Sequence, residues 1–286
     1  MQSSRTVCRL AALGAAVLFS TGGAAIKATT LTSWQVACFR SGIAALALIV
    51  LVPAARRNWT WRVPLAGVAY STTLVSFVLA NKLTTAANAV FLQSTSPLYL
   101  LLLSPWLLKE RIHRRDLLVM LLMAVGMALV LFSGQRQLAT APDPFSGNLL
   151  GALSGIAFAF TITSLRWLGS DRPSGGAAMA VVVAGNAVAC LVSLPQALPV
   201  LSSTTADWLV LAYLGVFQIG LAYGLLTFAV KHLPALEVAL LILAEPALNP
   251  VWTVIVHGER PAAWAIFGGV LILSATLANL FRRSGS

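Results

Sequence analysis

The sequence predicts an all-α membrane protein in which ten transmembrane helices form two inverted five-helix repeats. Three observations support this fold class: the composition, a series of ten apolar segments, and a motif that occurs twice. The chain has 286 residues, of which 58% are hydrophobic and only 9% are charged. Soluble domains carry about 25% charged residues, so this chain cannot cover its surface against water. We therefore expect lipid to surround most of the molecule.

Ten apolar segments are each long enough to cross the hydrocarbon core, which requires about 20 helical residues. In chain order they cover roughly 8–27, 33–52, 63–81, 86–107, 116–133, 147–168, 176–194, 207–230, 235–257 and 262–281. The apolar runs are continuous rather than alternating, which favours helices over the strands of a membrane barrel. The first segment follows Arg5 and Arg9 as in a signal peptide, but it is longer than the usual apolar region of about 7–15 residues. We expect it to remain as the first membrane helix.

The distribution of basic residues predicts that both termini are cytoplasmic. Of the 19 Lys and Arg residues, fourteen fall on the side of the N-terminus. One, Arg40, lies inside a segment, and four fall on the other side: Lys27, Lys82, Arg136 and Arg260. Cytoplasmic loops carry the excess of Lys and Arg. The net charge of +11 is divided among short clusters and forms no continuous basic face, so we expect no nucleic-acid partner.

One motif occurs twice, with its members 149 residues apart (231 − 82 = 149). The paired positions are Lys82 and Lys231, Pro97 and Pro246, Glu110 and Glu259, and Arg111 and Arg260. The two copies indicate related units over 1–138 and 145–286, each with five helices. Because five is odd, the second unit is inverted relative to the first. Inverted units give nearly equivalent conformations open to either side, which favours a transporter with its substrate site between them near the midplane.

These features resemble the drug/metabolite transporter superfamily and, within it, the ten-helix EamA-type transporters. The matching signature is the proline in the fourth and ninth helices, the Glu-Arg pair after each, and small residues in the helix that follows, here Gly126, Gly268 and Gly269. The resemblance covers nearly the whole chain. In size and layout the chain is most similar to the YddG-type exporters of aromatic amino acids. The resemblance implies export across a bacterial inner membrane, and a central cavity among helices one, three, four, six, eight and nine.

Glu245 is the sharpest substrate-binding candidate. It lies about ten residues into the ninth segment, or roughly 15 Å at 1.5 Å per residue. Pro246 follows it and removes a backbone hydrogen bond, and Asn249 lies one turn further on the same face. The carboxylate either binds a substrate amine or a proton in a cavity, or is a structural group beside the proline. Its equivalent in the first repeat is Ser96 (245 − 149 = 96), so the carboxylate is not part of the shared scaffold.

Other polar and aromatic residues at similar depth are candidates to line a substrate cavity. Gln93 and Gln218 offer donors and acceptors suited to a zwitterion, although either could instead fix helix packing. Tyr70, Thr73 and Phe77 share one face of the third segment, and Tyr99 adds aromatic surface in the fourth. Such a lining suits an apolar or aromatic side chain. The alternative for each aromatic residue is contact with lipid or with the core.

Two intramembrane features carry open alternatives. Arg40 lies about eight residues into the second segment, roughly 12 Å deep. It is either a counter-charge to a substrate carboxylate or one member of a structural pair. Gly22 and Gly23 permit bending or close helix approach in the first segment. Together with Pro97 and Pro246 they are predicted hinge or gate positions.

The remaining charged groups near segment ends are expected to have simple roles. Lys27 and Lys82 end outward-running segments, and we expect their side chains to reach toward water. Glu259 lies at a loop junction, where it would cap a helix or contact a gate.

No catalytic, cofactor-binding or metal-binding motif is visible in the sequence. Cys8, Cys38 and Cys190 have no metal-ligand spacing and are expected to be small packing residues. We therefore expect no cofactor and no enzymatic activity. The family resemblance implies a carrier that exports amino acids, aromatic or apolar ones in particular, or related small metabolites by alternating access, and we expect it to be a monomer in contact with lipid. The alternatives are efflux of drugs or other metabolites, exchange resembling that of nucleotide sugars, and, in a different class, a channel or binding module.

Overall fold

The computed structural model describes residues 2–57, 59–103, 114–134, 136–169, 175–230, 232–233 and 235–284. Within these ranges the chain is helical, and its single β-bridge joins Leu138 to Ala141. The elements are α1 (Gln2–Ser20), α2 (Gly22–Ala28), α3 (Ser33–Leu51), η1 (Pro53–Arg56), α4 (Arg62–Leu83), α5 (Ala86–Gln93), α6 (Ser96–Leu103), α7 (Arg114–Leu131), α8 (Pro144–Gly169), α9 (Gly175–Ala197), α10 (Thr205–Ala212), the π-helical η3 (Tyr213–Leu221), α11 (Ala222–Val230), α12 (Ala235–Ile242), α13 (Ala244–His257) and α14 (Ala263–Ser284).

Most predicted segments form helices long enough to cross a membrane. In the described part of the chain nine helical stretches are long and apolar enough, and α7 contributes a shorter apolar helix over Asp116–Leu131. Large apolar side chains cover the outside, with Leu46, Phe132 and Ile255 exposed by 67%, 76% and 68%. Such a surface requires lipid rather than water around it. The all-helical membrane fold is therefore confirmed, whereas the count of ten crossings and the cytoplasmic position of the termini stay predictions.

Local capping residues set several helix starts. Thr32 and Gln35 form a reciprocal capping box before α3, and Thr204 and Asp207 form one before α10. The side chain of Thr85 accepts a hydrogen bond from the amide of Asn88 and so caps α5. These side chains bind backbone N–H groups that the helix itself leaves without partners. The sequence therefore specifies where these three helices begin.

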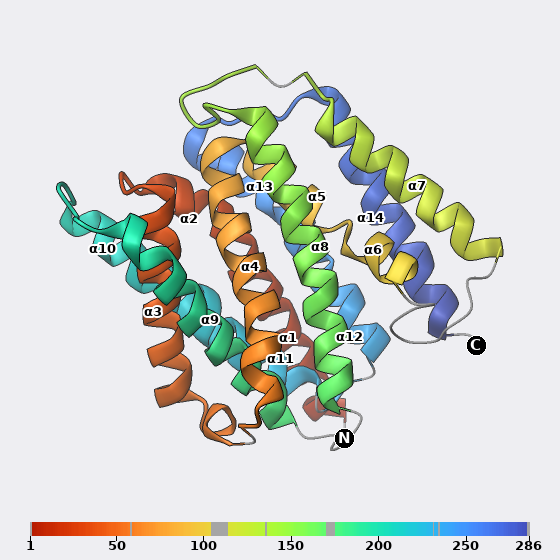
Figure 1. Ribbon diagram of the computed structural model, residues 1–286. Coiled ribbons are helices and arrows are strands. Elements are labelled where there is room, and N and C mark those ends of the chain that lie inside the picture. Colours follow the sequence, from red (N-terminus) through yellow and green to blue (C-terminus); the bar gives the residue numbers. More distant parts are fainter. Residues whose placement is uncertain are drawn as a thin grey trace.

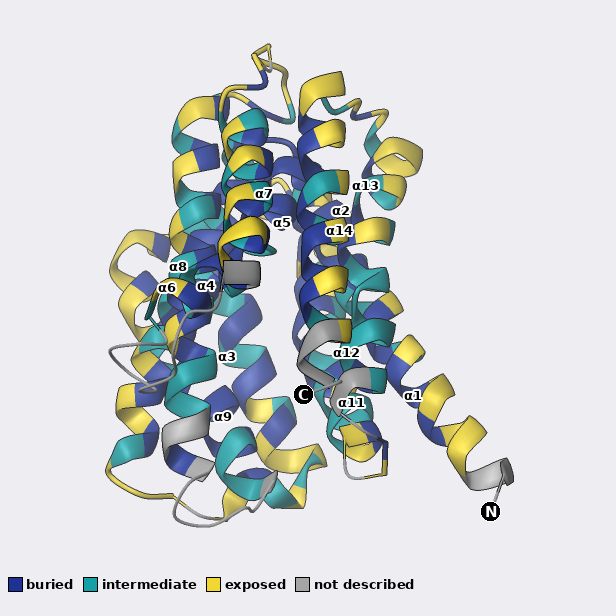
Figure 2. Ribbon diagram, turned by 90° about the vertical axis from the view of Figure 1, so that its right-hand side faces the viewer, coloured by how far each residue is buried: buried dark blue, intermediate teal, exposed yellow. Residues whose placement is uncertain are grey.

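The helices form one bundle with both chain ends at the same end (Figure 1). The main contacts join α4 to α8 and α9, α3 to α9, α1 to α11 and α13, and α7 to α14. The α7–α14 pair forms one edge of the bundle, and α3, α9 and α10 lie at the opposite edge (Figure 1). Buried residues follow the inward faces of the helices, and exposed residues follow the outward faces (Figure 2).

Small residues let particular helices approach closely. A Cβ atom at Gly126 of α7 would lie 2.8 Å from the carbonyl oxygen of Gly268 in α14, and one at Gly268 would lie 2.6 Å from that of Gly126. On the other side of the bundle, the thiols of Cys38 in α3 and Cys190 in α9 lie 3.6 Å apart. Close approach increases van der Waals contact, which is the main attraction between helices in lipid. Both cysteines are free packing residues, as predicted.

The repeated motif is described only in part. Lys82, Pro97, Pro246 and Glu259 belong to the described residues, whereas Lys231, Glu110 and Arg111 lie outside them. The division of the chain into units 1–138 and 145–286 stays a prediction.

Candidate functional site

Four of the membrane-crossing helices are irregular at mid-depth. The first divides into α1 and α2 at Thr21, the fourth into α5 and α6 at Ser94-Thr95, and the ninth into α12 and α13 at Leu243. The eighth contains the π-helical η3. Irregular backbone at membrane depth is tolerated where protein buries it or where it lines a water-filled cavity. Interrupted helices also mark the binding sites of many secondary transporters, so the three breaks and the π-helical segment locate the candidate site.

The breaks in the fourth and ninth helices occupy equivalent positions of the repeat (94 + 149 = 243). Pro97 is the second residue of α6 and Pro246 the third residue of α13. In the first turn of a helix the missing N–H of proline costs no intrahelical hydrogen bond. The two predicted hinge prolines therefore stand just after a break in the same way. Pro246 is buried and Pro97 is half-buried.

Hydrogen bonds hold the first helix at its break. The Thr21 hydroxyl lies 2.8 Å from the Tyr213 hydroxyl of η3, and the indole of Trp252 in α13 donates to Ser20 over 2.8 Å. The amide nitrogen of Gln218 in η3 donates to the Phe19 carbonyl over 3.4 Å. The eighth and ninth helices therefore both contact the break in the first.

Gly22 and Gly23 permit this close approach. A Cβ atom at Gly22 would lie 2.8 Å from Nε2 of Gln218, and one at Gly23 would lie 2.7 Å from Oδ1 of Asn249 and 2.8 Å from Cβ of Ala86. Real Cβ atoms do not tolerate such distances without movement of a neighbour. Of the two roles left open by the sequence, the structure shows close helix approach at both glycines. Their role as a hinge stays a prediction.

Two of the predicted amides keep unused hydrogen-bonding groups. Asn249 is fully buried, and neither Oδ1 nor Nδ2 has a hydrogen-bond partner in the described structure. Gln218 is 6% exposed, and its Oε1 is also unpaired there. Buried polar groups without partners are costly and need a reason. Both side chains adjoin the break in the first helix and are available to a ligand or to water.

The amide Gln93 and the hydroxyl Thr73 lie together on the other side of the bundle interior. Nε2 of Gln93 donates to the Ser154 hydroxyl of α8 over 2.8 Å, and that hydroxyl donates to the Thr73 carbonyl over 3.1 Å. The Thr73 and Thr161 hydroxyls lie 3.4 Å apart. Gln93 and Thr73 thus join α5, α4 and α8, which is the packing role that the sequence left open for Gln93.

Tyr70 contacts the opposite half of the chain. Its hydroxyl donates to the Tyr223 hydroxyl of α11 over 2.7 Å, and the two rings meet edge to face with centroids 6.2 Å apart. Phe19 of α1 packs edge to face on Tyr223 at 5.1 Å. This cluster brings together the first, third and eighth helices.

Glu245 is half-buried in the first turn of α13, beside the break at Leu243. The described part of the chain offers it no hydrogen bond and no ion pair. Its charge acts on the Tyr223 hydroxyl, which places the carboxyl near the tyrosine pair. An intramembrane carboxylate without a protein partner is the strongest feature of the site.

The remaining predicted residues have packing environments. Phe77 belongs to an apolar cluster that includes Ile26, Val90 and Phe91. The Tyr99 hydroxyl donates to the Met127 sulfur over 3.2 Å. Phe77 therefore lies in the core, and Tyr99 joins α6 to α7; a substrate contact of either residue stays a prediction.

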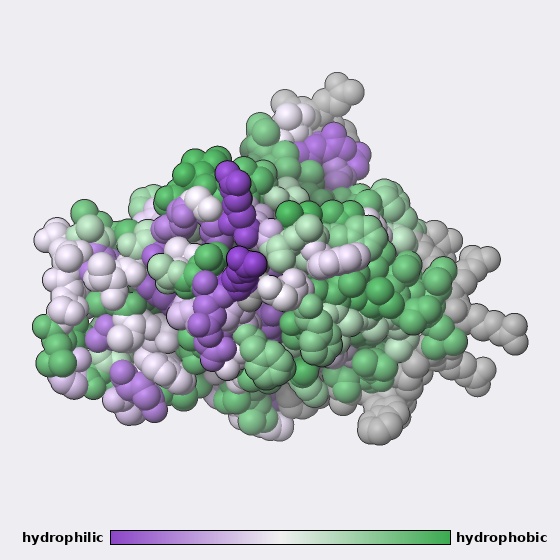
Figure 3. Space-filling view, turned by 90° about the horizontal axis from the view of Figure 1, so that it is seen from above, coloured by the Kyte–Doolittle hydropathy of each residue, from purple (hydrophilic) through white to green (hydrophobic). Residues whose placement is uncertain are grey.

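A buried ion pair lies at the end of the bundle opposite the termini. Nζ of Lys27 in α2 lies 3.4 Å from Oε1 of Glu259, which follows α13, and the side chains are 2% and 0% exposed. Nζ of Lys27 also donates to the carbonyls of Thr84 and Thr140, and the Ala86 amide donates to Glu259 Oε2 over 3.4 Å. Burial raises the pKa of the Glu259 carboxyl, and Lys27 opposes that shift. Seen from this end, polar side chains gather over the middle of the face, with apolar ones beside them (Figure 3).

The expectation that the Lys27 side chain reaches water is wrong, because it is buried among carbonyl groups and Glu259. Sequence reasoning missed the pair, since the partners lie 232 positions apart (259 − 27 = 232) and each has a simple reading at its own helix end. We call Lys27, Thr84, Thr140, Ala86 and Glu259 the Lys27–Glu259 cluster.

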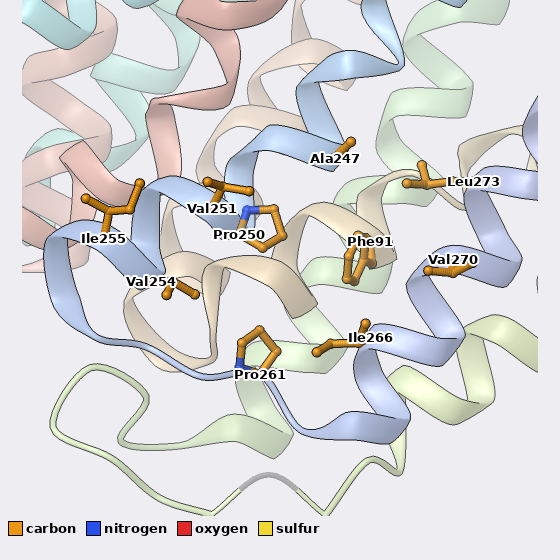
Figure 4. A pocket seen from close by; sticks show the side chains of 10 residues that line it. All are labelled: Phe91, Ala247, Pro250, Val251, Val254, Ile255, Pro261, Ile266, Val270 and Leu273. Atoms are coloured by element: carbon orange, nitrogen blue, oxygen red, sulfur yellow. The ribbon is translucent and has the colours of Figure 1, made fainter.

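A separate apolar groove of about 450 Å³ lies between α5, α13 and α14 (Figure 4). Its ten lining residues are Phe91, Ala247, Pro250, Val251, Val254, Ile255, Pro261, Ile266, Val270 and Leu273. All are apolar, and several are exposed on the lipid-facing surface. A polar solute finds no partner there, so the groove is distinct from the polar cluster around the helix breaks.

Comparison with known proteins decides the family. The profile of the family described as "EamA-like transporter family" matches residues 7–132 and 145–281. The chain belongs to the EamA-like transporter family. It is also 28% identical over 283 residues to the "Pseudopaline exporter CntI" of two Pseudomonas aeruginosa strains, UCBPP-PA14 and PAO1, with 94% of each chain covered. The fold of this EamA-like chain is similar to a solved crystal structure at a TM-score of 0.64 and 21% identity, with 97% of each chain covered.

Proposed function

We propose that this EamA-like transporter exports amino acids, aromatic or apolar ones in particular, or related small metabolites across the bacterial inner membrane by alternating access. The observation that carries the proposal is Glu245, a half-buried carboxylate without a partner among the described residues, next to a helix break and near a tyrosine pair from both halves. A carboxylate in this position suits a substrate amine, and the tyrosines and Phe19 offer aromatic surface to a side chain.

The relatives support export as the direction, because the two that match over nearly their whole length carry the name of an exporter. Their printed substrate, pseudopaline, favours export of another metabolite as the second candidate function. The two candidates share the mechanism and differ in the size and chemistry of the solute.

The test is a counterflow screen of amino acids with the purified protein in proteoliposomes at two pH values. A carrier shows saturable exchange of labelled against unlabelled substrate, whereas a channel does not. We expect counterflow with aromatic and apolar amino acids. A transporter that exchanges no amino acid under these conditions would contradict the proposal.

Substitution of Glu245 tests the site itself. Glu245→Gln removes the charge at nearly constant volume, so we expect a changed pH dependence of transport or a lower affinity for amines, with little loss of folded protein. The matched control is Glu237→Gln, since Glu237 precedes the same break but pairs with Arg5 and Arg9 at the bundle end. Wild-type kinetics of Glu245→Gln across pH would overturn its role.

A further inference from the structure

Arg40 is the most deeply buried charge of the described chain without a carboxylate beside it. It lies on α3 with 2% of its surface exposed, and neither Nε nor Nη1 has a hydrogen-bond partner there. The ion pairs found in the described residues involve Arg5, Arg9 and Lys27, and none involves Arg40. The structural pair considered from the sequence is therefore absent from this part of the chain. A buried guanidinium with free donors is costly unless another state of the protein supplies an anion.

The groups around Arg40 come from three other helices. Tyr70 of α4 and Tyr223 of α11 lie within electrostatic range of the guanidinium. Asn186 of α9 lies close to the Tyr70 hydroxyl, and its Oδ1 is unpaired although the residue is fully buried. The two tyrosine hydroxyls of this cluster bond directly to each other.

Glu245 also lies within electrostatic range of the tyrosine pair. The Tyr223 hydroxyl is within range of the charges of both Arg40 and Glu245. The Tyr223 hydroxyl thus has a cation and a carboxylate within electrostatic range, and neither charge is paired within the described protein. A solute that carries an ammonium and a carboxylate on one carbon atom has the complementary charges.

We propose that Arg40, together with the Tyr70 and Tyr223 hydroxyls, binds the carboxylate of a zwitterionic substrate whose ammonium binds Glu245. The inference rests on the proposed function and deepens it, because it restricts the substrates to molecules that bear both groups. Arg is suited to this role, since its planar fork donates two parallel hydrogen bonds to one carboxylate.

The tyrosine pair controls access to Arg40. Tyr70 belongs to the first half of the chain and Tyr223 to the second, so a relative movement of the halves separates their hydroxyls. The arriving carboxylate then replaces the hydroxyl–hydroxyl bond and accepts hydrogen bonds from both tyrosines and from Arg40. In the arrangement described here the bond is intact and Arg40 is covered.

The experiment measures binding to the purified full-length protein in detergent by titration calorimetry, with three related probes. Phenylalanine carries both charged groups, phenylalaninamide lacks the carboxylate charge, and phenethylamine lacks the carboxyl group. For wild type we expect phenylalanine to bind more tightly than the other two. Arg40→Gln should weaken phenylalanine binding roughly 10- to 100-fold and leave phenethylamine binding unchanged, because only the former loses a charged hydrogen bond.

Two further variants protect the test against a folding defect. Tyr223→Phe removes one hydroxyl while keeping the ring. It should weaken the binding of phenylalanine by about 3- to 10-fold and leave the binding of phenethylamine unchanged. Arg136→Gln removes an exposed arginine and should change neither affinity. A purely structural Arg40 would reduce the binding of all probes alike.

The outcomes separate the two proposals. If wild type binds phenylalanine and the Arg40 and Tyr223 variants bind it equally well, the carboxylate site is overturned while amino-acid export stands. If wild type binds neither phenylalanine nor any other amino acid of the counterflow screen, the proposed function fails and the carboxylate site fails with it.

Discussion

Helices α6 and α13 begin within one residue of equivalent positions in the two halves but carry different groups there. Each follows a break and carries a proline in its first turn, Pro97 in α6 and Pro246 in α13. The residue before the proline is Ser96 in the first half and Glu245 in the second. The broken backbone is thus common to both halves, and the charge belongs to one.

The third and eighth helices also differ, and again it is the second half that has the additional feature. Helix α4 runs without interruption from Arg62 to Leu83, whereas its counterpart contains the π-helical η3. π-helical segments occur frequently at functional sites. The second half therefore supplies the π-helical segment and the carboxylate, while Thr73 and Gln93 of the first half bond to α8. We infer that the two halves have the same helix arrangement but contribute different groups to substrate binding.

The largest expected effect on transport comes from overpacking the contact between the first helix and the second half. Gly23→Leu places a side chain where Asn249 Oδ1 and Ala86 Cβ already lie, 2.7 and 2.8 Å from the new Cβ. Overpacking of this kind costs about 1–3 kcal/mol. We expect transport in proteoliposomes to fall below detection.

Gly224→Leu is the matched control, because nothing lies within 4 Å of a Cβ atom at that position. It should retain most of the transport activity. Equal activity of the two variants would show that the contact at Gly23 does not matter to transport.

An intermediate effect is expected from moving the carboxylate between the halves. Glu245→Ser should lower transport by about 10- to 100-fold, the loss expected for a charged hydrogen bond. Adding Ser96→Glu places a carboxylate at the equivalent position of the first half and should not restore transport, because Tyr223 and η3 lie in the second half. Restoration in the double variant would mean that the halves are functionally interchangeable.

The smallest expected effect concerns the Lys27–Glu259 cluster and its pH dependence. Burial raises the pKa of Glu259, so the buried arrangement holds the proton more tightly than one in which the carboxyl meets water. Acidification therefore favours the buried arrangement, and that contribution is lost as pH rises through the raised pKa. We expect a few-fold rise with pH in the labelling of a cysteine at Thr140 by a membrane-impermeant reagent.

Two variants sharpen this comparison. Glu259→Gln should make the labelling independent of pH over this range. Lys27→Met removes the cation that opposes the pKa shift, so the rise in labelling should move to higher pH. Lys82→Met is the control, since Nζ of Lys82 bonds to Thr29 in the described structure rather than to a carboxylate. A pH profile unaffected by Glu259→Gln would assign the dependence to another group.

Much of the fold could be predicted because the membrane imposes strong local rules. The apolar segment predicted over 33–52 forms α3 at Ser33–Leu51, and the capping box of Thr32 and Gln35 sets its first residue. The break at Leu243 was less visible, because Pro246 marks the region but not the residue at which the helix stops. The π-helical backbone of η3 has no sequence signature of its own.

The sequence selected candidate residues for the site but could not give their contacts. Depth within a segment identified Glu245, Gln218 and Arg40, because a polar group far from a helix end needs a reason. Partners distant in sequence could not be inferred, as the bond between Tyr70 and Tyr223 across 153 positions shows. Distances of this kind depend on how the two halves pack, which no single segment encodes.

The thiols of Cys38 and Cys190 meet where α3 crosses α9, the second and seventh predicted segments, which correspond to each other in the two repeats. In the alternating-access motion that we propose, we expect this contact between corresponding helices to move less than the ends of the bundle. We therefore expect that a covalent link between the two sulfur atoms would join the halves without preventing their relative motion.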